Sequence, residues 1–144
     1  MRGLDILREV SFLLPMVPEM EIAASQEATA FAAAMGMSAD RIDEIRMAVV
    51  EACINAMEHS RASDQLVHLR LAALGRQHPE RLEITIRDQG VGFRPESVED
   101  PSMDSKIHDP RKRGWGLKII RGLMDDVAIT SDARGTTLVM VKAR

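Results

Sequence analysis

The sequence is poor in cysteine and in aromatic residues, and neither sign of charge dominates it. Its 144 residues include one cysteine, Cys53, no tyrosine and only 3% aromatic residues. A single cysteine excludes a disulfide within the chain and favours a reducing, cytoplasmic setting. The scarcity of aromatic side chains argues against a base-stacking surface. A net charge of -3 argues against a nucleic-acid binder, which normally presents a basic face.

Long hydrophobic runs are also absent. No stretch approaches the roughly 20 apolar residues that span a bilayer, and Met1–Asp5 lacks the charged start and long apolar middle of a signal peptide. We therefore expect no membrane association. Hydrophobic residues make up 45% of the chain and charged residues 28%, as in soluble globular proteins. The length fits one domain with its own core.

Apolar spacing and turn residues predict an α+β fold. Apolar residues recur at helical spacing after Ser38, a typical helix N-cap residue. The expected elements are a strand at Arg8–Leu14, helices at Glu19–Met35 and from Ser38 to about His59, strands at Val67–Leu74 and Leu82–Arg87, a helix at Gly116–Met124, and a hairpin of Val127–Ser131 with Thr136–Val141. This order predicts a two-layer α/β sandwich, with helices on one face of an antiparallel or mixed sheet.

Residues 94–113 differ from the rest of the chain. They include three prolines, five acidic and five basic residues, and few large apolar residues. We expect a long loop there, and loops of this length in a compact domain are usually functional lids or disordered segments.

The second predicted helix carries a polar stripe. Glu51 and Asn55 are four residues apart and share one helix face, and Glu58 falls on the same stripe. One interpretation is a solvated surface. The other is a carboxylate and an amide oxygen directed at a hard cation such as Mg2+, which prefers oxygen ligands.

Three glycine-containing motifs follow along the chain. Asp88 precedes Gly90 and Gly92 directly after a strand, Gly114-Trp115-Gly116-Leu117 opens a helix, and Gly135-Thr136-Thr137 lies in the last hairpin. Glycines permit close approach of the backbone to a ligand, and a helix N-terminus offers free N–H groups to phosphate. Taken singly, each motif also fits an ordinary turn or a solvated charge run.

Taken together, these motifs resemble the GHKL ATPases, and more narrowly the anti-sigma-factor serine/threonine kinases. The resemblance is carried by Val50–His59, Thr85–Gly92, Gly114–Leu117 and Met124–Thr137, and it extends from about Val10 to Val141. It implies the Bergerat (histidine-kinase-like) ATP-binding fold. It also implies a single domain over residues 1–144, with an ATP lid at about residues 93–113.

The resemblance implies a role for each motif. Asn55 would hold Mg2+ against the ATP phosphates, and Glu51 would be the catalytic carboxylate near the γ-phosphate. Asp88 would accept a hydrogen bond from the adenine amino group. The implied cofactor-binding residues are Asn55, Asp88, Gly90, Gly92, Gly114, Trp115, Gly116, Leu117, Thr136 and Thr137.

The resemblance also implies partners. It predicts an ATP- and Mg2+-dependent kinase that phosphorylates an anti-sigma-antagonist (STAS-like) protein and controls a sigma factor by partner switching. Members of the family are commonly homodimers. Their first helix often carries an arginine that grips partner proteins, and ungapped counting back from Glu51 places Ser25 there, among acidic residues. Whether a sigma factor is the partner is therefore left open.

Other functions compete with the kinase. The alternative is a non-catalytic, ATP-sensing module that sequesters a regulatory partner; Glu51 favours the kinase because a sensor needs no carboxylate there. A detached histidine-kinase catalytic domain is disfavoured, because the first 40 residues contain no histidine to accept phosphate. A purely structural or metal-binding domain would require all four motif matches to be coincidental.

Overall fold

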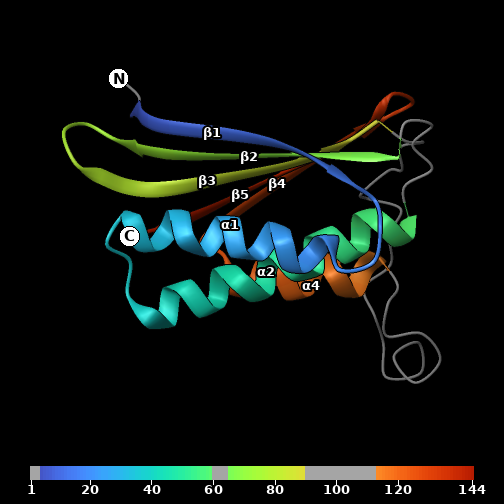
Figure 1. Cartoon of the computed structure of the whole chain (residues 1–144), viewed down its shortest axis with the longest axis horizontal. Helices are drawn as coiled ribbons and strands as arrows, with labels where there is room; N and C mark the ends of the chain where they lie inside the picture. Colours follow the sequence, from blue (N-terminus) through green and yellow to red (C-terminus); the bar gives the residue numbers. More distant parts are fainter. Residues whose placement is uncertain (1–3, 60–64, 90–112) are drawn as a thin grey trace.

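The computed structural model describes residues 4–59, 65–89 and 113–144. Within these ranges, five strands form one antiparallel sheet and three helices cover one of its faces (Figure 1). The strands lie in the order β1-β2-β3-β5-β4. Their bounds are β1 Asp5–Pro15, β2 Leu66–Gly75, β3 Pro79–Asp88, β4 Asp126–Asp132 and β5 Gly135–Ala143. The predicted two-layer α+β sandwich is confirmed.

The strand β1 is longer than the predicted Arg8–Leu14. It pairs along the whole of β2, from Asp5 opposite Gly75 to Pro15 opposite Leu66. The β1–β2 ladder is longer than predicted because β2 offers backbone N–H and C=O groups for pairing over its full length. The prediction used only the side-chain pattern of β1, which does not reveal this pairing. Pro15 ends the strand as predicted, and an edge strand tolerates proline.

The helices are α1 (Met20–Ala34), α2 (Ala39–His59) and α4 (Arg113–Leu123). Ser38 caps α2 as predicted, because its Oγ accepts a hydrogen bond from the Arg41 backbone N–H at 3.3 Å. The start predicted for α4 at Gly116 was wrong by three residues. Glycine has a low helix propensity, which favours a helix start after the glycines. The helix instead begins at Arg113, so Gly114 and Gly116 both lie in its first turns.

The core lies between the sheet and the helices. Alternate strand residues point inward, as the burial pattern of β5 shows, and meet the apolar faces of the helices. Cys53 is fully buried in this core, as predicted. The largest completely buried side chains are Ile45, Leu69, Leu71, Leu82, Ile84, Ile120 and Met140.

A buried lysine fixes the end of α4 to the sheet. Lys142 of β5 is 4% exposed, and its Nζ donates a hydrogen bond of 2.5 Å to the backbone carbonyl of Leu123. The same Nζ lies 3.3 Å from Oε1 of Glu44 in α2. A cation suits this place because the last carbonyls of a helix lack partners within the helix. The contact therefore joins α4, β5 and α2.

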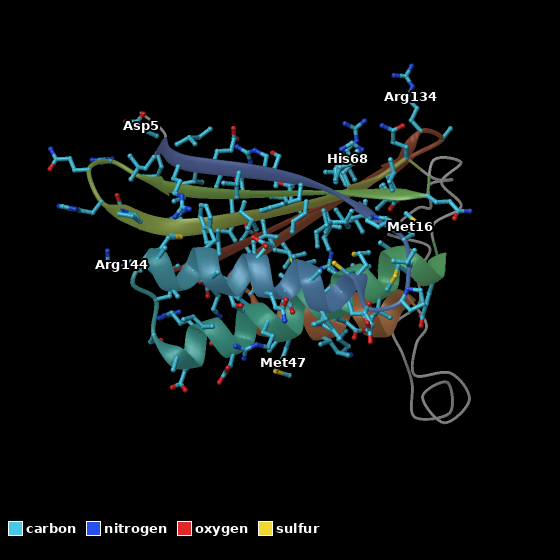
Figure 2. All side chains as sticks on the ribbon, in the orientation of Figure 1. Asp5, Met16, Met47, His68, Arg134 and Arg144 are labelled. Carbon is cyan, nitrogen blue, oxygen red and sulfur yellow. The ribbon has the colours of Figure 1, made fainter. Side chains whose placement is uncertain are left out.

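The other face of the sheet carries none of the described helices. Arg70 of β2 forms ion pairs there with Glu9 of β1 and Glu83 of β3, the latter at 2.8 Å. Figure 2 shows His68 and Arg134 on this side of the sheet, away from the helices. Among the described helices, none combines the length and apolarity required to cross a bilayer.

Candidate nucleotide site

The polar stripe of α2 faces the beginning of α4. Glu51 and Asn55 are both half-buried. A β-carbon on Gly116 would stand 3.4 Å from Oε1 of Glu51 and 3.5 Å from Oδ1 of Asn55. A carboxylate oxygen and an amide oxygen therefore converge on one backbone position. Glu51 and Asn55 are thus only partly exposed to solvent, whereas Glu58 on the same stripe is exposed.

The first turns of α4 add backbone donors to this place. The first four N–H groups of a helix have no partner within the helix, and they favour bound anions. Gly114 and Gly116 lie in this segment, as the predicted phosphate motif requires. Leu117 is buried in the core, so its side chain anchors the helix. It is the fifth residue of α4, so its N–H lies beyond the four free donors.

A small pocket adjoins Asn55 on the sheet side. Its polar lining consists of Asn55, Asp88 and Thr136, and its apolar walls are Ala52, Ala56, Ile86, Ile129 and Leu138. Asp88 ends β3 and is 7% exposed. A buried carboxylate within apolar walls can accept a hydrogen bond from an amino donor.

Thr136 is the threonine that belongs to this pocket. It lies opposite Asp88 in the β3–β5 ladder, and its Oγ1 shares a hydrogen bond of 2.9 Å with Oγ of Ser131. Thr137, one residue on, lies on the opposite face of the sheet with Arg87 and Thr130. The structure therefore brings Thr136 to Asp88 and does not bring Thr137 there, because successive strand residues point to opposite faces.

Gly135 holds the hairpin against the end of β3. Its φ is +147°, and a β-carbon there would stand 2.1 Å from the carbonyl oxygen of Asp88. Only glycine satisfies both the backbone angle and this close approach. The β4–β5 turn is thereby packed directly on the residue that forms the base of the pocket.

Several predicted site residues are not placed. Gly90, Gly92 and the lid expected at about residues 93–113, except its last residue, lie outside the described residues. Trp115 lies in the first turn of α4, but the structure describes only the backbone of Trp115 and of His59. For these residues the predicted roles stay predictions.

Sequence reasoning missed most of the pocket wall. Ser131, which supports Thr136, and the apolar residues Ile86, Ile129 and Leu138 were not assigned to the site. Strand alternation was the available signal, because Ile86 lies two residues before Asp88 in β3 and Leu138 lies two residues after Thr136 in β5, on the same sheet face.

The geometry defines a class of protein. On this α+β sandwich, one helix carries a carboxylate and an amide oxygen, the N-terminal turn of a second helix faces them, and a buried aspartate ends a strand. This arrangement is typical of nucleotide sites. In agreement, the family described as the histidine kinase-like ATPase domain matches residues 14–142. The chain belongs to this family.

The curated relatives narrow the family to one branch. "Serine-protein kinase RsbW" of Bacillus licheniformis is 32% identical over 117 residues, which cover 77% of this chain and 70% of the relative. RsbW of Bacillus cereus strain Q1 is 32% identical over 112 residues, which cover 75% and 68%. The chain is thus a member of the RsbW family of serine-protein kinases.

Solved structures share the fold. The RsbU and RsbW domains of Rv1364c from Mycobacterium tuberculosis match with a TM-score of 0.69 and 19% identity, over 95% of this chain and 33% of that one. The SiaB–SiaC complex of Pseudomonas aeruginosa matches with a TM-score of 0.57 and 8% identity, over 96% and 91%. At these identities the likeness is one of fold.

Proposed function

We propose that this chain transfers the γ-phosphoryl group of Mg-ATP to a serine or threonine of an anti-sigma-antagonist protein, and that the transfer decides which regulatory partner the chain holds. The observation that carries the proposal is the convergence of Glu51 and Asn55 on Gly116, at the N-terminal turn of α4. A nucleotide sensor would need the pocket and the helix N-terminus, but no carboxylate at this position.

The adenine would enter the Asp88 pocket. The buried carboxylate of Asp88 accepts a hydrogen bond from the exocyclic amino group, and Thr136 lines the same pocket. Asn55 belongs both to this pocket and to the contact with Gly116. A nucleotide bound by its base at Asp88 would therefore direct its phosphates past Asn55 to the free N–H groups of α4.

The residues present fit a magnesium ion. Mg2+ prefers oxygen ligands and is usually held by one or two protein groups together with phosphates and water. Oδ1 of Asn55 supplies such an oxygen at the phosphate end of the site. Among the described residues no cluster of three or more metal-ligating side chains occurs, so an ion here would depend on the nucleotide. When bound, Mg2+ neutralises charge on the phosphates.

Glu51 would accept the proton of the substrate hydroxyl group. The substrate hydroxyl oxygen forms a bond to the γ-phosphorus while the bond to the bridging oxygen of ADP breaks. The hydroxyl proton passes to Oε1 of Glu51. Phosphoryl transfer depends mainly on positioning and charge neutralisation, so one oriented carboxylate together with backbone donors is sufficient chemistry.

We propose the partner classes by analogy with the relatives. One structural neighbour contains RsbU and RsbW domains in a single protein, and another is a SiaB–SiaC complex. A small antagonist protein is the substrate we propose, in the cytoplasm, with a sigma factor as the second partner and a homodimer as the assembly. Ser25 is buried and donates its hydroxyl to the carbonyl of Ile22. A sigma factor would therefore contact residues of α1 other than Ser25.

A phosphotransfer assay tests the proposal. The purified chain is incubated with Mg-ATP and the anti-sigma-antagonist protein encoded nearest to it, and phosphoserine or phosphothreonine is sought by mass spectrometry. Glu51→Gln should reduce the transfer rate by about a hundredfold or more while ATP affinity stays within about twofold, since a positioned base contributes rate and not binding. Glu58→Gln, the same change at an exposed position of the same helix, should transfer normally.

The outcomes separate the two functions. ATP binding with no transfer at any time would leave the sequestering sensor as the function and refute the kinase. Transfer that survives Glu51→Gln undiminished would refute the role of Glu51 but not the kinase itself.

A further inference from the structure

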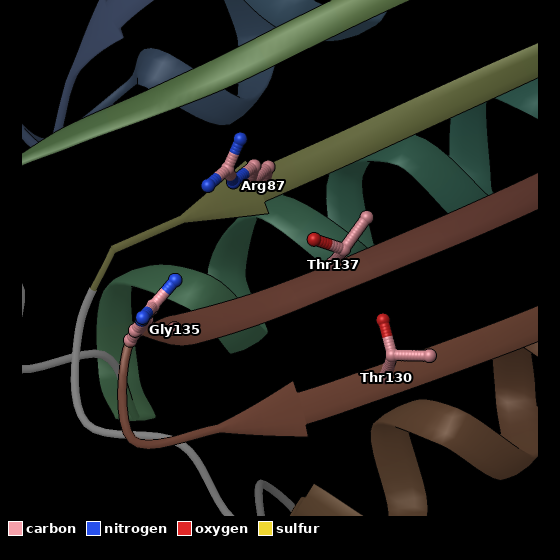
Figure 3. A pocket seen from close by; sticks show the side chains of 5 residues that line it. Arg87, Thr130, Gly135 and Thr137 are labelled. Carbon is pink, nitrogen blue, oxygen red and sulfur yellow. The ribbon is translucent and has the colours of Figure 1, made fainter.

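A second pocket lies on the helix-free face of the sheet. It has a volume of about 190 Å³ and is lined by Arg87, Thr130, Arg134, Gly135 and Thr137. Figure 3 shows the side chains of Arg87, Thr137 and Thr130 on three neighbouring strands, beside the β4–β5 turn at Gly135. The nucleotide site does not account for this pocket, although Gly135 and Thr137 belong to the last glycine-containing motif of the sequence.

Strand register builds the base of the pocket. Arg87 of β3 lies opposite Thr137 of β5, and Thr137 lies opposite Thr130 of β4. Directly opposed residues on one sheet face have their β-carbons about 5 Å apart. His68 of β2 continues the row, because it lies opposite Arg87. Arg134 enters from the two-residue turn between β4 and β5.

The described side chains that line the pocket are hydrogen-bond donors. The guanidinium groups of Arg87 and Arg134 carry only donors, and the hydroxyls of Thr130 and Thr137 can also donate. None of these described lining side chains is acidic. Two guanidinium forks with two hydroxyls match a tetrahedral oxyanion with several acceptor oxygens, since arginine binds phosphate in bidentate fashion.

We propose that this pocket binds a phosphate group on the face of the sheet opposite the nucleotide site. The ligand chemistry is a phosphate dianion or phosphate monoester, held by Arg87 and Arg134 with hydrogen bonds from Thr137 and Thr130.

The two sites are separate although they share strands. Asp88 and Thr136 point toward the helices, whereas their neighbours Arg87 and Thr137 point to the outer face. A nucleotide phosphate in the inner site therefore cannot occupy the outer pocket, because the sheet lies between them. The outer phosphate must come from another molecule.

A titration with inorganic phosphate, followed by the backbone amide signals of the full chain in NMR spectra, tests the proposal. The amides of Thr130 and Thr137 should shift saturably. Arg87→Gln should weaken this binding by about tenfold or more, as expected for loss of one charged bidentate partner. The matched control is Arg81→Gln, the same change at an exposed outer-face position of the same strand, and it should bind within about twofold of the unaltered chain. Thr137→Val keeps a β-branched strand residue, removes one donor, and should also weaken binding.

Further arms identify the source of the phosphate. Tighter binding of O-phospho-L-serine than of inorganic phosphate would indicate a phosphorylated side chain, and the reverse order would indicate free phosphate; both support the site. The proposal is overturned by shifts confined to Asn55, Asp88 and Gly116, by equal losses in Arg87→Gln and Arg81→Gln, or by acetate binding as tightly as phosphate. A flat titration at Thr130 and Thr137 would overturn it as well.

Discussion

Gly116 of α4 faces Asn55 of α2, and a β-carbon on Gly116 would stand 3.5 Å from Oδ1 of Asn55. The same β-carbon would stand 3.4 Å from Oε1 of Glu51. The absence of a side chain at Gly116 thus leaves two side-chain oxygens accessible at a helix N-terminus. We expect nucleotide binding at the candidate site to depend on this opening.

Gly116→Ala should impair the site without unfolding the chain. The added methyl would occupy the space between the two oxygens and the α4 backbone, so we expect nucleotide affinity to fall by about tenfold, or 1.4 kcal/mol. Gly122→Ala is the control in the same helix, because a β-carbon there meets nothing within 4 Å. It should leave binding unchanged and raise the free energy of unfolding by up to about 1 kcal/mol through helix propensity. Calorimetric titration with Mg-ATP and urea denaturation measure both effects. Equal affinities for the two variants would contradict the placement of the phosphates.

Asn55→Ala should abolish measurable binding of Mg-ATP. The change removes the amide oxygen that we propose holds Mg2+ against the phosphates, and the methyl group of alanine has no oxygen to replace it. Calorimetry with and without Mg2+ tests the part played by the metal, because the unaltered chain should lose affinity for ATP without Mg2+, whereas Asn55→Ala should show no measurable binding in either case. Undiminished affinity of Asn55→Ala for Mg-ATP would mean that the metal assignment is wrong.

Gly135→Ala should destabilise the chain more than Gly36→Ala. Both glycines have positive φ, +147° and +84°, but only at Gly135 does a β-carbon collide with backbone, 2.1 Å from the Asp88 carbonyl oxygen. Gly36→Ala should cost about 1–2 kcal/mol of unfolding free energy from its left-handed backbone alone. Gly135→Ala should exceed this cost and weaken ATP binding, since the end of β3 must move. Urea denaturation compares the two variants. A smaller loss of unfolding free energy in Gly135→Ala than in Gly36→Ala would refute the close approach of Gly135 to the Asp88 carbonyl.

The sequence predicted the fold well and the site only in part. Period-two alternation at Leu82–Arg87 and the Ser38 cap located strands and a helix that the structure confirms. Motif spacing found Glu51 and Asn55, whose distance depends only on helix geometry. The choice between Thr136 and Thr137 required strand register, and the contact with Gly116 required the packing of two helices far apart in the chain. Those relationships are tertiary, so spacing alone does not contain them.

The thiol of Cys53 should be unreactive in the folded chain. Burial, together with the smaller effect of the nearby Glu21 carboxylate, raises the pKa of Cys53 to about 12. Because only the thiolate reacts, a disulfide reagent at pH 8 should modify Cys53 only after unfolding.

The raised pKa of Cys53 also affects stability, because its thiol ionises at a lower pH in the unfolded chain than in the folded chain. The Cys53 contribution to stability is therefore intact below pH 9 and lost between about pH 9 and 12. Cys53→Ala should show a smaller decline of unfolding free energy over this range, and identical declines would contradict the assignment.

Lys142→Met should destabilise the chain although methionine suits a core position. Lys142 would be read from sequence as a surface residue, because lysine is rarely buried without a partner. In the structure it donates to the Leu123 carbonyl at the end of α4 and approaches Glu44, whose side chain is 41% exposed. Loss of the lysine leaves a helix-end carbonyl without its donor, at a cost of about 1–3 kcal/mol. Water can solvate Glu44, so Glu44→Gln should cost less than about 1 kcal/mol. Urea denaturation of both single variants and of the double variant tests this order. If Glu44→Gln costs as much as Lys142→Met, the ion pair and not the hydrogen bond to Leu123 holds α4 in place.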